Sequence, residues 1–273
     1  MTMPSIVVSA DHPETARAVG QQAAKALGYQ YVGGDSLEEI AERYGVSERK
    51  LRRALDHTSA NRFGKKSRRL VLSYIETATL EALSKGEMVC AELGAHLYVC
   101  GVPHVLMVRV LEDGPSQVQR LVDQRKVTAR KAQKLLDKDR ALRVRWSMDN
   151  FGFDEGTSDV YDLAIRLAPI DTSKVVDVLV DMAKYRKFKP TTYSRKLMAD
   201  LLLASRVRMA LLEKHSEFKV RADGDTAIVH VKCSKRHKQK VAESIKETVA
   251  ESTDVKLVQV HAVQSRRDLD AVQ

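Results

Sequence analysis

Short apolar runs alternate with helical segments over the first 185 residues of the chain. The runs are rich in Val, Ile and Leu, which is typical of buried strands. Between them, apolar residues recur at helical spacing and stop at glycines such as Gly28 and Gly86. The predicted strands are 5–9, 29–32, 88–91, 105–110 and 160–167, and the predicted helices are 14–27, two short ones within 36–55, 70–84, 120–145 and 173–184. This alternation predicts an α/β fold with a mostly parallel sheet covered by helices on both faces.

A second pattern begins after the basic stretch 185–189 and the linker-like residues 190–192. The predicted elements are a helix at 195–212, strands at 218–222 and 226–233, a helix capped by Ser234 and running to 251, and a strand at 255–263. The turn Asp223-Gly224-Asp225 joins the first two strands as a hairpin. We therefore expect an α/β domain over 1–185, a linker at 186–193, and a small α-β-β-α-β domain over 194–273.

Composition narrows the class of protein. An apolar content of 44% with only 5% aromatic residues predicts a core of aliphatic side chains. The three cysteines form no CxxC pair, which fits a reducing compartment, and the eight histidines lack ligand spacing, so no metal site is expected. The first residues do not resemble a signal peptide, and no apolar run approaches the ~20 residues of a membrane span. We expect a cytoplasmic protein without a membrane span.

The net charge of +10 leaves two interpretations open. A chain this basic attracts polyanions, which include nucleic acid, nucleotides and anionic surfaces. The 36 acidic residues are interspersed with the basic ones, however, so the excess can equally be solvated surface charge. The sequence does not specify an oligomeric state.

Three stretches carry a resemblance to a known family. They are the opening SIVVSADHPETARAVGQQAAKALGYQYV, the central MVCAELGAHLYV, and LLDKDRALRVRW followed by DVYDLAIRL. In order and spacing, residues 1 to about 184 resemble the cytidylate kinase-like family of P-loop proteins. The resemblance implies a parallel-sheet nucleotide-binding fold related to nucleoside monophosphate kinases.

The turn after the first strand departs from that family. Where the family has a glycine-rich phosphate loop, this chain has Asp11-His12-Pro13-Glu14-Thr15-Ala16-Arg17. Pro13 has no N–H to donate, and Asp11 and Glu14 place negative charge where a triphosphate would lie. Arg17 is the one cation left at the position where the family has one. We expect ATP binding in the usual pose to be disfavoured.

A second departure concerns phosphate transfer. The family shows Gly-Arg-Gly where this chain has Ala91-Glu92-Leu93-Gly94, so Glu92 reverses a charge that faces the reacting phosphate. Phosphoryl transfer depends on electrostatic stabilisation of an anionic transition state. We therefore assign no catalytic residue and do not expect a working enzyme. The alternative is an active nucleoside monophosphate kinase-like phosphotransferase.

The charged region 120–145 resembles the family's lid helix and keeps its arginines. One interpretation is a surviving anion site for a nucleoside monophosphate or another small anionic ligand. The other is an exposed helix with pairs such as Asp137–Arg140, each worth a few tenths of a kcal/mol. The candidate residues are Arg17, Arg120, Arg125, Arg130, Asp137, Arg140 and Arg143. No cofactor is expected beyond such a nucleotide ligand.

The C-terminal segment resembles the BON domain, found in proteins that bind phospholipid, small ligands or other proteins. LLLASRVRMALL, AIVHVKC and KVAESIKETVAESTDVKLVQVHAV carry the resemblance. The basic cluster Lys235, Arg236 and Lys238 near the start of its second helix is a candidate docking patch for a protein partner, an anionic surface or nucleic acid. It can equally be solvated charge.

The segment 36–57 also fits a helix-turn-helix, which keeps a DNA-binding alternative open. Ser47 would cap a recognition helix carrying Arg49, Lys50 and Arg53. The kinase-like family has a helical pair at the same place, and this segment is inserted between strands. We expect a non-catalytic, ligand-sensing or regulatory protein on a nucleotide kinase scaffold.

Overall fold

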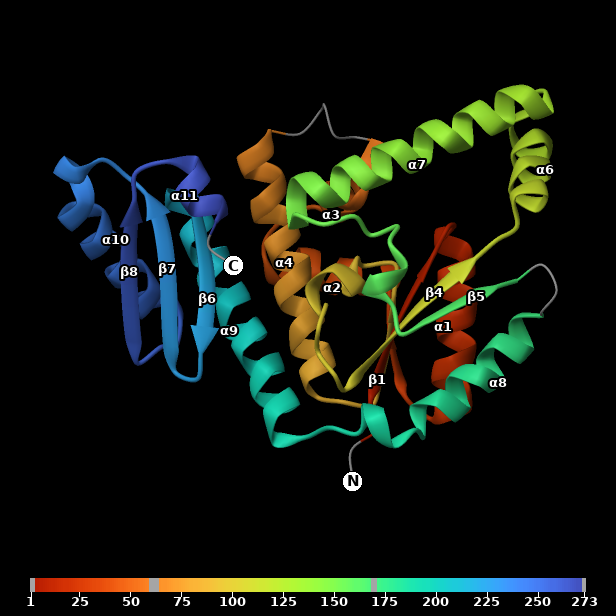
Figure 1. Cartoon of the computed structure of the whole chain (residues 1–273), viewed down its shortest axis with the longest axis horizontal. Coiled ribbons are helices and arrows are strands. Elements are labelled where there is room, and N and C mark those ends of the chain that lie inside the picture. Colours follow the sequence, from red (N-terminus) through yellow and green to blue (C-terminus); the bar gives the residue numbers. More distant parts are fainter. Residues whose placement is uncertain (1–2, 59–63, 168–170, 272–273) are drawn as a thin grey trace.

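Three buried, mostly apolar strands form the centre of a five-stranded parallel sheet (Figure 1). The computed structural model describes residues 3–58, 64–167 and 171–271. The strands are β1 (Ser5–Ala10), β2 (Gln30–Val32), β3 (Met88–Ala91), β4 (Val105–Leu111) and β5 (Leu163–Arg166), in the order β2-β3-β1-β4-β5. Ile6 lies between Val89 and Leu106 in the register. Because nearly every residue of β1, β3 and β4 is buried, both faces of the sheet must be covered, as predicted.

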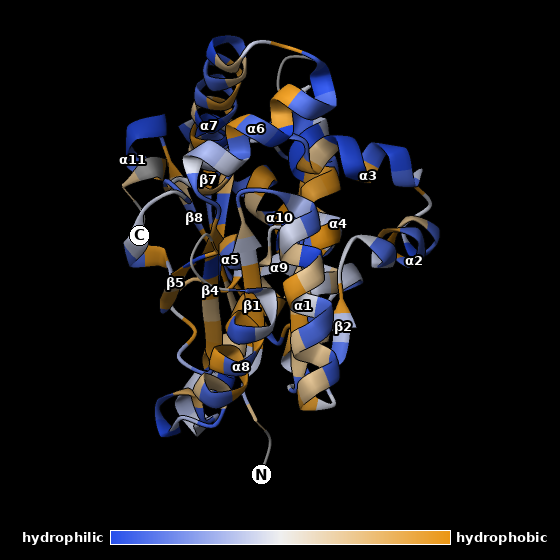
Figure 2. Ribbon diagram, turned by 90° about the vertical axis from the view of Figure 1, so that its right-hand side faces the viewer, coloured by the Kyte–Doolittle hydropathy of each residue, from blue (hydrophilic) through white to orange (hydrophobic). Residues whose placement is uncertain are grey.

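Alternate side chains of β1 enter two separate cores. Ile6, Val8 and Ala10 pack with α1 (Pro13–Leu27) and α8 (Thr172–Ala183) on one face. Val7 joins the larger core on the other face. That core is covered by α2 (Leu37–Arg43), α3 (Glu48–Leu55), α4 (Lys65–Ser84), α5 (Ala95–Tyr98) and α7 (Ala129–Phe151). Figure 2 shows apolar colours gathered on the central strands and hydrophilic colours along α3.

Three predicted boundaries are corrected. The charged region 120–145 is two helices, α6 (Gly114–Arg125) and α7, because Lys126 adopts a left-handed conformation (φ 52°) and the Thr128 side chain caps a new helix start. The helix predicted from 70 begins five residues earlier, at Lys65. Between β3 and β4 lies the short helix α5, where no helix was predicted.

The C-terminal elements follow the predicted α-β-β-α-β order. They are α9 (Thr192–Lys214), β6 (Phe218–Asp223), β7 (Thr226–Lys232), α10 (Lys238–Ser252) and β8 (Leu257–Val263), followed by α11 (Arg266–Asp270), which was not predicted. β6 and β7 are antiparallel, whereas β7 and β8 are parallel. The predicted cap Ser234 instead precedes a short 3-10 turn, and its hydroxyl lies 2.8 Å from His237 Nδ1.

Helix α9 packs along α4 and contributes to two cores. Met198, in its first half, belongs to the large core of the parallel sheet. Leu211 and Leu212, in its second half, belong to the core of the C-terminal sheet. The segment predicted as a linker, 186–193, holds a 3-10 turn (Arg186–Phe188) whose Phe188 is buried against the first sheet. The division into domains at this segment stays a prediction.

Candidate functional site

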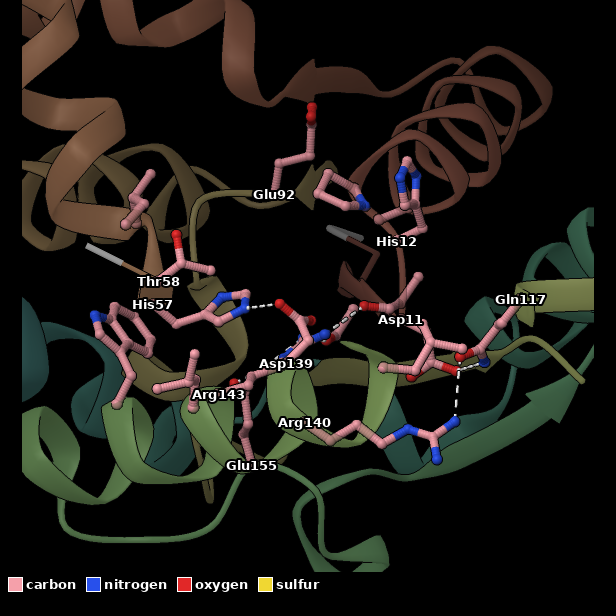
Figure 3. Close-up of a pocket in the computed structure, with 18 of the residues that line it drawn as sticks. Asp11, His12, His57, Thr58, Glu92, Gln117, Asp139, Arg140, Arg143 and Glu155 are labelled. Atoms are coloured by element: carbon pink, nitrogen blue, oxygen red, sulfur yellow. Dashed lines mark hydrogen bonds and ion pairs between the residues drawn. The ribbon is translucent and has the colours of Figure 1, made fainter. Parts of the chain in front are cut away.

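A cavity of about 610 Å³ opens at the carboxyl ends of β1, β3 and β4 (Figure 3). In open parallel sheets this edge is where ligands bind, because the turns that follow the strands present side chains and backbone groups there. The walls come from the β1–α1 turn, the end of α3, the start of α5, and one side of the α6–α7 hairpin. The cavity therefore lies between the phosphate-loop position and the predicted lid.

An arginine inside β4 holds the β1–α1 turn. Arg109 is 9% exposed and donates to Ser9 Oγ at 2.7 Å and to Asp11 Oδ1 at 2.7 Å. The other Asp11 oxygen accepts from the Glu112 backbone N–H at 3.1 Å and from Gln117 Nε2 at 3.0 Å. The Asp11 carboxylate is therefore bonded on both oxygens within the protein.

A second, partly buried arginine reaches the same turn from α7. Arg143 donates to the Ala10 carbonyl at 2.9 Å and to Glu155 Oε1 at 2.8 Å. His96 Nε2 lies 2.6 Å from Glu155 Oε2. Burial alone would raise the pKa of Glu155, but the contacts with His96 and Arg143 outweigh burial and lower this pKa to about 2. Burial lowers the pKa of His96, so a neutral imidazole donates Nε2–H to an ionised carboxylate.

The backbone of the β1–α1 turn lacks the features of a phosphate cradle. No residue from Asp11 to Ala16 has a positive φ. Pro13 is the first residue of α1, so this helix start has one N–H fewer to offer an anion. Successive backbone N–H groups converge on an anion when right-handed and left-handed residues alternate, and this turn does not alternate them.

Glu92 occupies the turn after β3 with a left-handed backbone (φ 69°). Its carboxylate accepts from Arg17 at 2.9 and 3.0 Å, from the Gly34 N–H at 3.1 Å and from the Tyr31 hydroxyl at 3.2 Å. The bond to Glu92 raises the pKa of Arg17. In Figure 3 the Glu92 side chain extends away from Asp139 and Arg143. The Arg17 charge is therefore paired within the protein, and Arg17 does not line the cavity.

The predicted lid residues separate into two groups. Arg120, Arg125, Arg140 and Arg143 line the cavity, whereas Arg130 and Asp137 are exposed outside it. Arg120 is paired with Glu112 at 2.5 Å, and Arg140 donates to Gln117 Oε1 at 3.1 Å. Arg140 also lies 4.0 Å from Asp137, which is the helix-surface pair that the sequence suggested. The hairpin thus brings four of the seven candidates to one cavity.

The opposite end of the cavity is more apolar. Leu55, Leu142 and Trp146 line it, next to a contact of 2.8 Å between His57 Nε2 and Asp139 Oδ1. The hydrogen bond from His57 lowers the pKa of Asp139. Trp146 is 5% exposed, and its indole Nε1 has no hydrogen-bond partner within the described ranges. An indole N–H is a donor only, so this buried group is left unsatisfied in the folded chain.

Sequence reasoning missed most of this network. Arg109 carried a usable signal, because it is the one charged residue in the otherwise apolar strand VLMVRVL. His96, Glu155 and Trp146 carried none, since they come from separate segments that meet only in the folded chain.

The remaining candidates lie outside the cavity. Arg49, Lys50 and Arg53 are exposed on α3, which follows α2 through a turn with Gly45 at φ 62° and packs on α4 through Leu51 and Ala54. Lys235, Arg236 and Lys238 are exposed ahead of and at the start of α10. Contact with DNA through α3, the BON-like assignment and its partners stay predictions.

The described residues contain neither a metal-ligand cluster nor a helix suited to cross a membrane. Among residues 3–58, 64–167 and 171–271, no group of three or more His, Cys, Asp or Glu side chains is placed to hold a metal ion. Over these same stretches, no helix combines the length and the apolar character that crossing a membrane requires.

Comparison with known proteins establishes a family. No curated protein matches the chain. A crystal structure of an uncharacterized protein from Eubacterium ventriosum ATCC 27560 is similar at a TM-score of 0.49 and 14% identity, over 67% of this chain and 99% of that one. Residues 12–168, more than half of the chain, match the cytidylate kinase-like family. The chain belongs to the cytidylate kinase-like family.

Proposed function

We propose that this chain is a non-catalytic, ligand-sensing member of its family that binds a nucleoside monophosphate in the cavity beside α7. The observation that carries the proposal is the pair of arginines at the β1–α1 turn, of which Arg109 is buried and Arg143 is partly buried. Arg109 holds Asp11, and Arg143 holds the Ala10 carbonyl and Glu155. In the turn where the family has its phosphate loop, the polar groups are therefore bonded to other protein groups.

Phosphate transfer needs free cations and backbone donors around a triphosphate. Here Pro13 removes a donor, the Asp11 carboxylate lies at the turn, and Glu92 neutralises Arg17. An ATP molecule in the usual pose would have to displace these contacts and approach ionised carboxylates. The family match favours a phosphotransferase, and the experiment below tests that alternative directly.

The two ends of the cavity suit the two ends of a nucleoside monophosphate. One face of α7 lines the cavity along its length, with Arg140 toward α6 and Trp146 toward α3. Arg125, Lys138 and Arg140 offer positive charge to a phosphate at the first end. Leu55, Leu142 and the Trp146 ring offer apolar surface to a base at the second end.

Calorimetric titration with CMP and with Mg-ATP tests the proposal. We expect CMP to bind and Mg-ATP not to bind. The double variant Arg125→Ala/Arg140→Ala should weaken CMP binding by at least tenfold, since charge-assisted hydrogen bonds are worth roughly 1.5–3 kcal/mol each. Arg130→Ala/Arg145→Ala, which removes the same charge from the hairpin outside the cavity, should leave the affinity unchanged.

A coupled assay for ADP release in the presence of CMP completes the test. The wild-type chain would be an active kinase if it transferred phosphate from ATP to CMP and Arg125→Ala/Arg140→Ala abolished this transfer. That outcome would refute the proposal that the chain is non-catalytic. If no nucleotide binds, the assignment of the cavity is wrong as well.

A further inference from the structure

The C-terminal sheet has one covered face and one open face. Phe218, Val220, Val229 and Val260 point to the side covered by α9 and α10 and form its core. Because side chains alternate along a strand, the residues between them point to the opposite side. Figure 1 shows both long helices on one side of this sheet, with only the short α11 near one end of the other.

The open face presents two rows of side chains in register across the three strands. Lys219, His230 and His261 form the first row. Arg221, Ile228 and Gln259 form the second. All six are exposed or partly exposed. Two of the six are cationic, two carry aromatic rings and none is acidic.

The two imidazoles lie parallel to each other. The ring centroids of His230 and His261 are 4.9 Å apart, with an interplanar angle of 19°. Burial, the neighbouring His261 and the cations Arg221 and Lys219 lower the pKa of His230, which keeps this ring neutral near pH 7. A neutral flat ring on a sheet surface is a surface on which another planar group can stack.

The acids at the edges of this face are already paired with lysines. Asp223 lies 2.5 Å from Lys196, Glu217 lies 2.9 Å from Lys232, and Asp225 lies 2.6 Å from Lys256. These pairs mask the negative charges that would repel a polyanion. The whole chain adds a net charge of +10, which attracts a polyanion from a distance.

We propose that this open sheet face binds single-stranded nucleic acid. Lys219 and Arg221 contact phosphates, and unpaired bases stack on the rings of His230 and His261. Flat basic surfaces with planar side chains bind single strands in this way, because every unpaired base offers a π face. A duplex keeps its bases stacked inside and cannot use the rings. This proposal does not depend on which ligand binds in the cavity at the edge of the parallel sheet.

Fluorescence anisotropy of the full chain with a labelled, mixed-sequence 12-nucleotide RNA tests the proposal between 50 and 200 mM KCl at pH 7.5. For single strands the salt slope is roughly −0.7 per phosphate contact. Lys219→Ala/Arg221→Ala should therefore reduce the slope by about 1.4. His230→Ala/His261→Ala should weaken binding at least fivefold and change the slope much less than Lys219→Ala/Arg221→Ala does, since stacking on a base releases no counterions.

Matched variants separate this face from the other basic surfaces. Lys240→Ala/Lys246→Ala removes two exposed charges from α10, on the other side of the C-terminal sheet, and should change the affinity for RNA little. Lys235→Ala/Lys238→Ala and Arg49→Ala/Arg53→Ala test the two basic clusters seen in the sequence. The proposal is wrong if any of these weakens binding as much as Lys219→Ala/Arg221→Ala, if a duplex of the same sequence binds as tightly, or if no binding occurs at 50 mM KCl. Unchanged thermal melting would show that the variants are folded.

Discussion

At the scale of single residues, the cavity is lined by polar side chains that form hydrogen bonds and ion pairs with one another. The side chain of Glu155 is 4% exposed and accepts from both Arg143 and His96. Isolated burial of a carboxylate is unfavourable, but these contacts reverse the effect and lower its pKa to about 2. The trio is therefore a cation, an anion and a neutral imidazole, with the anion shared between two donors.

Acid should weaken this trio. The pKa of Glu155 is about 2 in the folded chain against 4.5 for an unperturbed glutamate. Its contribution is present above about pH 4.5 and is lost as pH falls toward 2, because the unfolded chain then binds the proton more readily. A shift of this size corresponds to about 3 kcal/mol. The lowered pKa of His96 acts in the same direction, starting near pH 6.5.

Urea denaturation between pH 7 and 3 measures this contribution. Glu155→Gln should lower the free energy of unfolding by about 3 kcal/mol at pH 7, and its difference from the wild type should shrink steadily below pH 4.5. Glu247→Gln, at an exposed position of α10, should change the stability little at any pH. A difference for Glu155→Gln that is independent of pH would contradict the assignment of an ionised, paired carboxylate.

At the scale of elements, α9 was predicted correctly as a helix, but its role was not visible in its sequence. Its apolar positions resemble those of a helix that covers one sheet. In the folded chain the first half packs in the large core with Met198, and the second half packs under the C-terminal sheet with Leu211. Which neighbour each half meets depends on α4, more than a hundred residues earlier.

The second half of α9 should be sensitive to truncation. Leu211 is fully buried in the C-terminal core, so Leu211→Ala leaves a cavity and should lower the free energy of unfolding by about 3 kcal/mol. Leu203, on the same helix, is only partly buried, and Leu203→Ala should have a much smaller effect. Chemical denaturation of the two variants measures the difference, and equal losses would show that α9 is not anchored as described.

At the scale of the whole molecule, polar contacts tie the two sheets together through α4 and α9. Thr77 Oγ1 donates to Ser205 Oγ at 3.2 Å in a buried position. Glu81 accepts from Arg206 of α9 at 2.8 Å and from Arg43 of α2 at 2.5 Å. The Glu81 carboxylate of α4 therefore links α2, on the parallel-sheet side, to α9, which packs under the C-terminal sheet.

We expect this coupling to make unfolding cooperative. Differential scanning calorimetry should show one transition whose calorimetric and van't Hoff enthalpies agree, although the chain contains two sheets. Glu81→Ala removes the contacts to both helices and should lower the melting temperature. Two separate transitions in the wild-type chain would show that the sheets unfold independently and would support the predicted linker instead.

The order of elements was predictable because it depends on local patterns. The apolar runs of β1, β3 and β4 and the helical spacing of α1 and α8 are properties of neighbouring residues. The split at Lys126 and the short α11 were missed, since a left-handed residue and a five-residue helix depend on caps that periodicity does not register.

The sequence by itself determined the fold class, the resemblance to the cytidylate kinase-like family, and the absence of glycines from the turn at Asp11. Each of these is a statement about residue types at short spacing. Only the tertiary structure decided that Arg109 and Arg143 meet at that turn, that Glu92 holds Arg17, and that four of the lid candidates share a cavity. The physical reason is that charge pairing and burial depend on distances in space, and folding brings together groups as far apart along the chain as Ser9 and Arg143, which are separated by 134 positions.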